Sequence, residues 1–409
     1  MPIKQAERWA ARWFEFCLYL ILIGIPVSRA LVEIGSTGAL AGWIWLGFIR
    51  KNWGFRSSPV FWPLLGYTLF SGLSYFWSGH RDATLSSWVG KTIQYSGLYL
   101  AAWGGLRDLK TIRRLLWATL VIAAIICADG LYQIATGHDF FLGYGAGLLA
   151  EGRRMTATLK YPNDLGAYLG FVFWIGAGIL WADLRAKRVR CLMLSLLLTI
   201  IAGCVVLTYS RSAWMGLGAA LFFFTLLSRK KKMAWIAAIG LMTLAALLPT
   251  RFMNRGSGFF DIHAGSSSEE RLLVWDATWK MIQDRPVAGS GLNTFNAEFR
   301  KYKPEQVWGN PYVHNSYLQM TAEQGFIGLI LFLSILVGFF SYGLVINPGL
   351  SIEGRLAHGL SAGLVGYLVH SFFDSNLYIL PLAALFWTFM GITSRLHALA
   401  AVSTRPEKS

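Results

Sequence analysis

Charged residues are scarce in this chain: Asp, Glu, Lys and Arg make up 14% of its 409 residues, whereas hydrophobic residues make up 55%. Soluble domains carry about 25% charged residues, so this composition excludes a soluble globular protein. Aromatic residues reach 15%, which excludes a disordered chain and is typical of membrane proteins with aromatic belts at the lipid interfaces. The composition predicts an all-α polytopic membrane protein.

Cysteine is also scarce, and Cys17, Cys127, Cys191 and Cys204 form no CxxC pair and no Cys/His metal spacing. Each lies in an apolar stretch, so we expect small buried hydrophobic residues. The chain lacks P-loop, GxSxG, HExxH and Asp-x-Asp motifs. Their absence argues against an ATP-driven pump, a serine hydrolase, a zinc protease and a metal-dependent sugar transferase of the usual kinds. We therefore expect any chemistry to need no metal and no cofactor.

Long apolar runs fill most of the chain. A bilayer core about 30 Å thick requires about 20 apolar residues per helix, and about twelve runs approach that length. We predict that residues 1–409 form one integral membrane domain. The candidate spans are residues 13–28, 36–49, 58–77, 89–105, 113–135, 164–182, 191–208, 212–228, 233–249, 314–344, 357–374 and 380–396.

The formal charge of +16 is explained by topology. Lys and Arg cluster at the N-terminus and after every second span, and such clusters mark cytoplasmic loops. The pattern predicts cytoplasmic termini and no nucleic-acid partner. Two long segments, 136–163 and 250–313, then form a short and a large loop on the opposite face of the membrane.

The large loop contains a predicted amphipathic helix at about 268–284. Two capping-box patterns open it, Ser266 with Glu269 and Ser267 with Glu270. Apolar residues then recur at helical spacing, which favours a helix lying on the membrane or on the spans. They are Leu272, Trp275, Trp279 and Ile282.

His314 is the sharpest candidate for chemistry on the outer face. It precedes Asn315 and Ser316, either of which can cap the next helix, and the apolar run proper begins only at Phe326. The first turns therefore stand above the bilayer or line a wet cavity, where an imidazole can accept a proton near neutral pH. An interfacial histidine that only completes the cap is the alternative.

Two arginines are candidates for binding an anion. Arg211 lies in the first turn of a span, where a cation opposes the helix macrodipole and a bound anion would offset the cost; an arginine reaching lipid phosphates is the alternative. Arg271 lies in the first turn of the amphipathic helix, where a local ion pair with Glu269 or Glu270 is the simpler interpretation.

A second set of candidates lies before the span at 164–182. Its three cations can bind a phosphate or face lipid headgroups, and Asn163 or Asp164 is the expected helix cap. The set comprises Arg153, Arg154, Lys160 and Asn163. Ionisable residues in or near spans usually have a functional role. For four such residues, a buried partner or a wet cavity is the simpler explanation. They are Asp129, Glu323, His370 and Asp374.

Several motifs within about residues 150–330 together resemble the O-antigen ligase and polymerase superfamily. They are Tyr-Pro-Asn-Asp at 161–164, Ser-Arg-Ser-Ala-Trp at 210–214, Arg271 with Trp275, Asp-Arg-Pro-Val-Ala-Gly-Ser-Gly-Leu-Asn-Thr-Phe at 284–295, and His-Asn-Ser-Tyr at 314–317 with Glu323-x-Gly325. One departure is Tyr161, which stands where the family commonly has Asn.

The resemblance implies a GT-C-like glycosyltransferase with a periplasmic active site. The resemblance implies a location in the bacterial inner membrane, with segments 136–163 and 250–313 as periplasmic loops. An O-antigen ligase moves a glycan from undecaprenyl pyrophosphate to a sugar hydroxyl of the lipid A core, and the resemblance implies that this transfer is metal-independent and inverting. By resemblance, His314 is the general base, and Arg211 and Arg271 bind the pyrophosphate. Tyr312 and Asn315 flank the histidine as further candidates.

Two rival functions remain open. An O-antigen polymerase or a protein O-oligosaccharyltransferase would use the same donor with another acceptor. A flippase or transporter of the lipid-linked glycan would need charged residues at mid-span, whereas the ionisable groups cluster at the outer ends of the spans.

Overall fold

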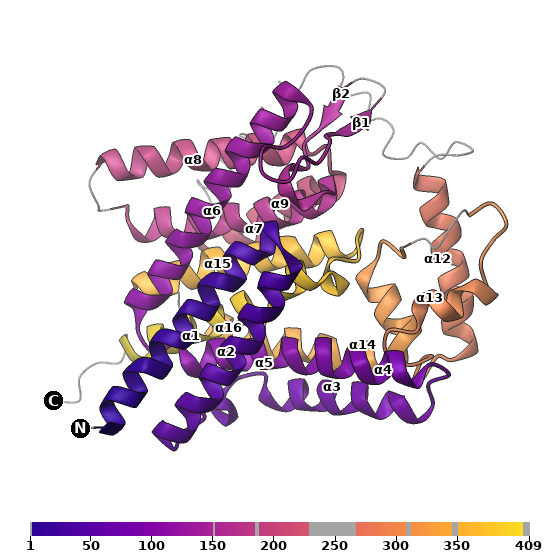
Figure 1. Ribbon diagram of the computed structural model, residues 1–409, viewed down its shortest axis with the longest axis horizontal. Helices are drawn as coiled ribbons and strands as arrows, with labels where there is room; N and C mark the ends of the chain where they lie inside the picture. The colour runs from indigo at the N-terminus through magenta and orange to yellow at the C-terminus, as the bar shows by residue number, and fades with distance from the viewer. Residues whose placement is uncertain are drawn as a thin grey trace.

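The computed structural model describes residues 2–149, 152–184, 188–228, 267–307, 312–345 and 351–403. These segments are mostly helical (Figure 1). The elements are α1 (Pro2–Val27), α2 (Arg29–Arg50), η1 (Phe55–Ser57), α3 (Phe61–Leu73), η2 (Ser74–Phe76), α4 (Arg81–Ser87), η3 (Trp88–Ile93), α5 (Gln94–Gly105), α6 (Leu109–Thr136), β1 (Gly147–Leu149), β2 (Gly152–Arg154), η4 (Ala157–Leu159), α7 (Pro162–Ala182), α8 (Arg188–Leu207), α9 (Arg211–Ser228), α12 (Ser267–Asp284), α13 (Phe295–Glu298), η5 (Phe299–Lys301), α14 (Ser316–Val345), α15 (Ile352–Ser371), η6 (Asn376–Tyr378) and α16 (Leu380–Ser403).

The helices confirm an all-α polytopic membrane protein. Within the described residues, α1, α2, α6, α7, α8, α14 and α16 are long and apolar enough to cross a bilayer. Four further predicted spans coincide with α3, with η3 and α5, with α9 and with α15, which are shorter or less apolar. The predicted span at 233–249 lies outside the described residues.

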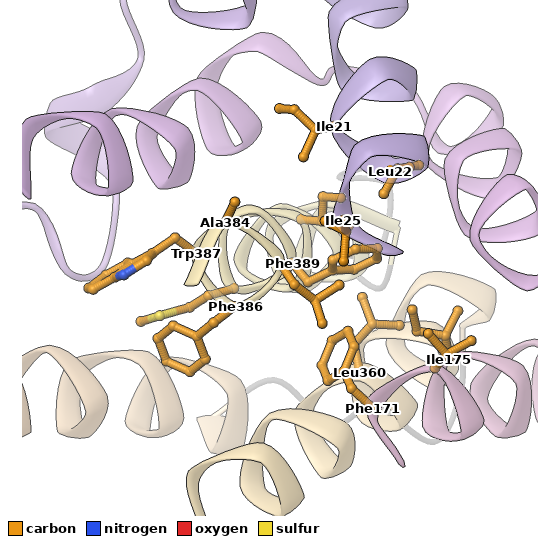
Figure 2. Close-up of a cluster of buried hydrophobic side chains, with 14 of the residues drawn as sticks. Ile21, Leu22, Ile25, Phe171, Ile175, Leu360, Ala384, Phe386, Trp387 and Phe389 are labelled. Carbon is orange, nitrogen blue, oxygen red and sulfur yellow. The ribbon is translucent and has the colours of Figure 1, made fainter. Parts of the chain in front are cut away.

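Helix α16 forms the centre of the bundle. Its apolar stretch is 72% buried, compared with 28% for the peripheral α8. Figure 2 shows Phe386 and Phe389 of α16 among side chains from α1, α7 and α15, such as Ile25, Phe171 and Leu360. This packing joins segments from both ends of the chain. Cys17, Cys127 and Cys204 are buried, as predicted, whereas Cys191 is only partly buried.

Helix α15 packs closely against α7 and α9. A Cβ added at Gly366 of α15 would lie 2.7 Å from the carbonyl oxygen of Gly216 in α9. Small residues allow such close approach between membrane helices. The contact brings the end of α15, and the turn at 372–376, near the start of α9.

The segment before α7 folds differently from the sequence prediction. Strands β1 and β2 form an antiparallel hairpin, with Gly147 paired to Arg154, that the sequence did not predict. The predicted cap is wrong: Tyr161 is the N-cap and Pro162 the first helical residue. Proline suits that position because its fixed φ matches the helix and its missing N–H would have no intrahelical partner.

Helix α12, α13 and η5 form a unit beside the membrane helices (Figure 1). Its own small core includes Val274, Met281, Phe295 and Phe299. The buried face of α12 differs in part from the predicted one, because Ile282 is buried but Leu272 and Trp279 are 45% and 46% exposed. The helix turns Val274 and Met281 toward this local core instead. Ser266 lies outside the described residues.

This unit is joined to the bundle at an interruption in α14. Gly325 has φ 63° and ψ −172°, so the helix is interrupted there. The segment 286–291 fills the gap: Phe326 N donates to Pro286 O at 2.8 Å, and Gly291 N donates to Glu323 O at 2.8 Å. We call this pairing of 286–291 with 322–327 the clasp.

Candidate active site

His314 faces a buried carboxylate from a distant part of the sequence. Its Nδ1 lies 3.4 Å from Oδ1 of Asp374, and the two side chains are 34% and 8% exposed. Asp374 lies in the turn between α15 and α16. An imidazole held through Nδ1 leaves Nε2 as the nitrogen that can accept a proton from a bound hydroxyl.

The backbone around His314 is held from several sides. His314 has φ 51°, a left-handed conformation that is rare outside glycine and clusters at functional sites. Asn315 caps α14, since its Oδ1 accepts from the backbone N–H of Tyr317 and Leu318, both at 3.0 Å. This bears out the predicted cap. Ser316 donates from its backbone N and its Oγ to the carbonyl oxygen of Asp374, at 3.1 and 2.9 Å.

Helix α12 contributes a further support for the histidine loop. Trp275 Nε1 donates to the carbonyl oxygen of Val313 at 2.8 Å, and the Trp275 ring packs edge-on against Phe372 at 5.9 Å. One side chain therefore joins α12 to the residue before His314 and to the turn that carries Asp374.

Arg271 interacts electrostatically with both Asp374 and Arg211. Burial lowers the pKa of the Arg271 guanidinium, the Asp374 carboxylate raises it, and the positive charge of Arg211 lowers it again. Among the described residues Arg271 forms no hydrogen bond or ion pair, so the expected local pair with Glu269 or Glu270 is not formed. Two guanidinium groups and an imidazole thus share one electrostatic neighbourhood.

Asp374 remains ionised in this setting. Burial raises its pKa, but the hydrogen bond with His314, the electrostatic contributions of His370 and His314, and the Ser375 N–H at 2.8 Å outweigh burial. The net effect holds the pKa of this carboxyl below its ordinary value.

Two further residues around Asp374 were not predicted as site residues. His370 Nε2 lies 3.1 Å from Ser212 Oγ, next to Arg211, so it links α15 to the start of α9. Asp164, at the start of α7, interacts electrostatically with Asp374 and Arg29. Sequence spacing contains no signal for either contact.

The cations of the 153–163 segment are largely occupied by the protein itself. Arg153 donates to the Ile134 and Ala135 carbonyls at the end of α6, at 3.0 and 3.3 Å. Arg154 donates to Thr208 O at 3.0 Å and to Asn163 Oδ1 at 3.4 Å. Lys160 lies over the Tyr161 ring at 5.8 Å.

Arg154 ties this segment to the residues just before Arg211. Tyr312 is 63% exposed and its ring lies 6.3 Å from that of His314, at the rim of the site.

Two other ionisable residues serve the fold. Asp129 Oδ1 accepts from Phe140 N at 2.8 Å. Glu323 accepts from Asn293 N at 2.9 Å and Phe295 N at 3.4 Å, which strengthens the clasp. For both residues a buried partner, the simpler explanation, is correct.

The chain is similar to a protein-family model and to curated proteins. Residues 194–333 match a family model described as O-antigen ligase, a segment that contains Arg211, Arg271 and His314. A "putative polysaccharide ligase" of Rickettsia conorii is 27% identical over 208 residues, which cover 48% of this chain and 49% of the relative. Another from Rickettsia felis is 28% identical over 209 residues, 48% of this chain and 50% of the relative. The chain thus spans about half the length of the curated relatives it matches.

Proposed function

We propose, from the confirmed resemblance to the O-antigen ligase family, that this integral membrane protein is a glycosyltransferase acting as an O-antigen ligase. It transfers a glycan from undecaprenyl pyrophosphate to a sugar hydroxyl of the lipid A core. The active site lies on the periplasmic face of the inner membrane, at His314. The reaction requires no metal ion.

His314 acts as the general base in this proposal. The acceptor hydroxyl gives its proton to His314 Nε2 as its oxygen forms a bond to the anomeric carbon. The bond from that carbon to the pyrophosphate oxygen breaks, and the electron pair leaves with the pyrophosphate. Asp374 holds Nδ1 and stabilises the imidazolium that forms. Direct displacement of this kind inverts the anomeric centre.

Arg211 and Arg271 bind the donor pyrophosphate. Guanidinium groups bind phosphate oxygens in bidentate fashion and stabilise charge that develops on a leaving group. The positive charge of Arg211 lowers the pKa of Arg271, so the two guanidinium groups interact electrostatically and a pyrophosphate can engage both. The observation that carries the proposal is the convergence of His314, Asp374, Arg271 and Arg211 from four separate segments.

A transfer assay with purified protein, lipid-linked donor and core acceptor tests the base. We expect His314→Gln to lower kcat by at least 100-fold, because general-base catalysis contributes about 10²- to 10⁴-fold. The control is Asp276→Asn, at an exposed site on α12, which should leave kcat unchanged. Gln319→Glu would not serve as a control, because Gln319 contacts Glu323. Normal transfer by His314→Gln would overturn the assignment.

Two further arms of the assay test metal independence and the acceptor. The rate of transfer should be unchanged in excess chelator. Loss of transfer in chelator, with recovery when divalent metal is added, would contradict the metal-free step. Offering core lipid, lipid-linked glycan and a hydroxyl-bearing protein separately distinguishes a ligase from a polymerase and from a protein O-oligosaccharyltransferase. Movement of donor across vesicle membranes without any transfer would instead indicate a flippase.

A further inference from the structure

An open groove lies at the start of α6, on the face that bears most of the cations. Its volume is about 760 Å³, and it is lined by Tyr19 of α1 and by Leu109, Lys110, Arg113, Arg114 and Trp117 of α6. Apolar and aromatic side chains form the walls, and three cations stand along one helix. The charge pattern of the sequence predicts that this face is cytoplasmic.

Two of the three cations have partners in the protein. Arg113 donates to Asp183 at 2.8 and 3.0 Å, and Arg114 donates to Glu15 at 3.0 Å. Arg190 also lies 3.7 Å from Asp183. Lys110 is exposed and has no hydrogen bond or ion pair among the described residues. The groove therefore retains a positive charge after its internal pairs are counted.

The local backbone adds to the attraction for an anion. Helix α6 begins at Leu109, with Asp108 as its N-cap accepting from Thr111 N at 2.7 Å. The first N–H groups of a helix and its macrodipole favour negative charge nearby. The Asp108 carboxylate opposes this effect in part, so the side-chain cations remain the main source of attraction.

We propose that this groove binds one monoanionic phospholipid of the adjoining leaflet. The phosphodiester contacts Lys110 and the remaining N–H groups of Arg114, while the start of an acyl chain lies along Trp117 and Tyr19. Cationic pockets between membrane helices bind anionic headgroups in this manner, and tryptophan and tyrosine prefer the headgroup level. The single unpaired ammonium matches the single charge of the lipid. This inference is independent of the proposed transferase activity.

Native mass spectrometry of the full-length protein in neutral detergent tests the proposal, with phosphatidylglycerol as the probe and phosphatidylcholine of the same chains as the neutral reference. We expect the first phosphatidylglycerol to bind at least fivefold more tightly. Lys110→Gln should remove about fivefold of that affinity, the effect of one cation near an anionic lipid. Trp117→Ala should weaken both lipids.

A matched control removes two exposed cations of α1, Lys4→Gln with Arg8→Gln, and should leave the lipid preference intact. An equal loss in this control would mean diffuse attraction without a site, and equal affinity of the unchanged protein for both lipids would overturn the proposal. Inorganic phosphate is the third arm. If phosphate alone displaces the lipid at similar concentration, the groove binds a soluble anion instead.

Discussion

Replacing Asp374 with Asn isolates the charge that faces His314. Asn keeps an Oδ1 acceptor for Ser375 N and leaves the carbonyl oxygen of Asp374 to accept from Ser316. The backbone of the site should therefore persist while one negative charge disappears. We expect kcat to fall by roughly 10- to 100-fold, with a smaller effect on the KM for the donor.

The magnitude follows from the distance between the two charges. At 3.4 Å, a carboxylate and an imidazolium attract by about 5 kcal/mol at an effective dielectric of 20 and about 1 kcal/mol in water. His314 is 34% exposed, so water screens the pair and about 1–3 kcal/mol is the appropriate range. Because each 1.36 kcal/mol is a tenfold change in rate, that range corresponds to the expected loss.

The assay compares initial rates of glycan transfer for the parent protein, Asp374→Asn and Asp276→Asn. Asp276 is 62% exposed and pairs with Lys280 in the same helix, so its change tests for a general effect of lost charge. The melting temperature of each variant in detergent separates misfolding from lost chemistry. A stable Asp374→Asn protein with kcat within twofold of the parent would refute the role of the pair.

Three other outcomes can be measured. Gly325→Ala should lower stability by about 2–4 kcal/mol, seen as a lower melting temperature, because its Cβ would lie 2.2 Å from the Val287 carbonyl oxygen at a left-handed φ; Gly203→Ala, in open space, should be near neutral. Arg271→Ala should raise the donor KM at least tenfold and Arg271→Lys less, whereas unchanged donor affinity would exclude pyrophosphate binding. The pKa of Asp374 is lower in the folded protein than its ordinary value. Its contribution to stability should therefore be complete above about pH 4 and lost as pH falls through the folded pKa. Asp374→Asn should remove this dependence from a plot of melting temperature against pH.

The sequence predicts the membrane helices well because their signal is local. A run of apolar residues identifies a span whatever surrounds it, and eleven predicted spans coincide with described helices. Features set by tertiary contact were harder to predict. The buried face of α12 follows Val274 and Met281 because Phe295 and Phe299 cover them, and no periodicity within the helix reveals which neighbours cover it.

The site shows the same division. His314 and Arg211 stand out because each combines an ionisable group with a helix start, a combination visible in a few residues. Asp374 lies sixty residues from His314, and nothing in its own surroundings distinguishes it from another buried carboxylate. Its role emerges only from the packing of α15 against α9 and α7.

The clasp also determines how much order the histidine loop must acquire when a substrate binds. Backbone hydrogen bonds of the clasp join Ser290 to Ala322 and Gly291 to Glu323. The chain from Gly291 to Ala322 is therefore a loop closed by the clasp, and His314 lies on this loop. The protein loses the conformational entropy of closing that loop once, during folding. The entropic cost is not repeated in each catalytic cycle. Loosening the clasp should therefore weaken substrate binding even when every residue that touches substrate is unchanged.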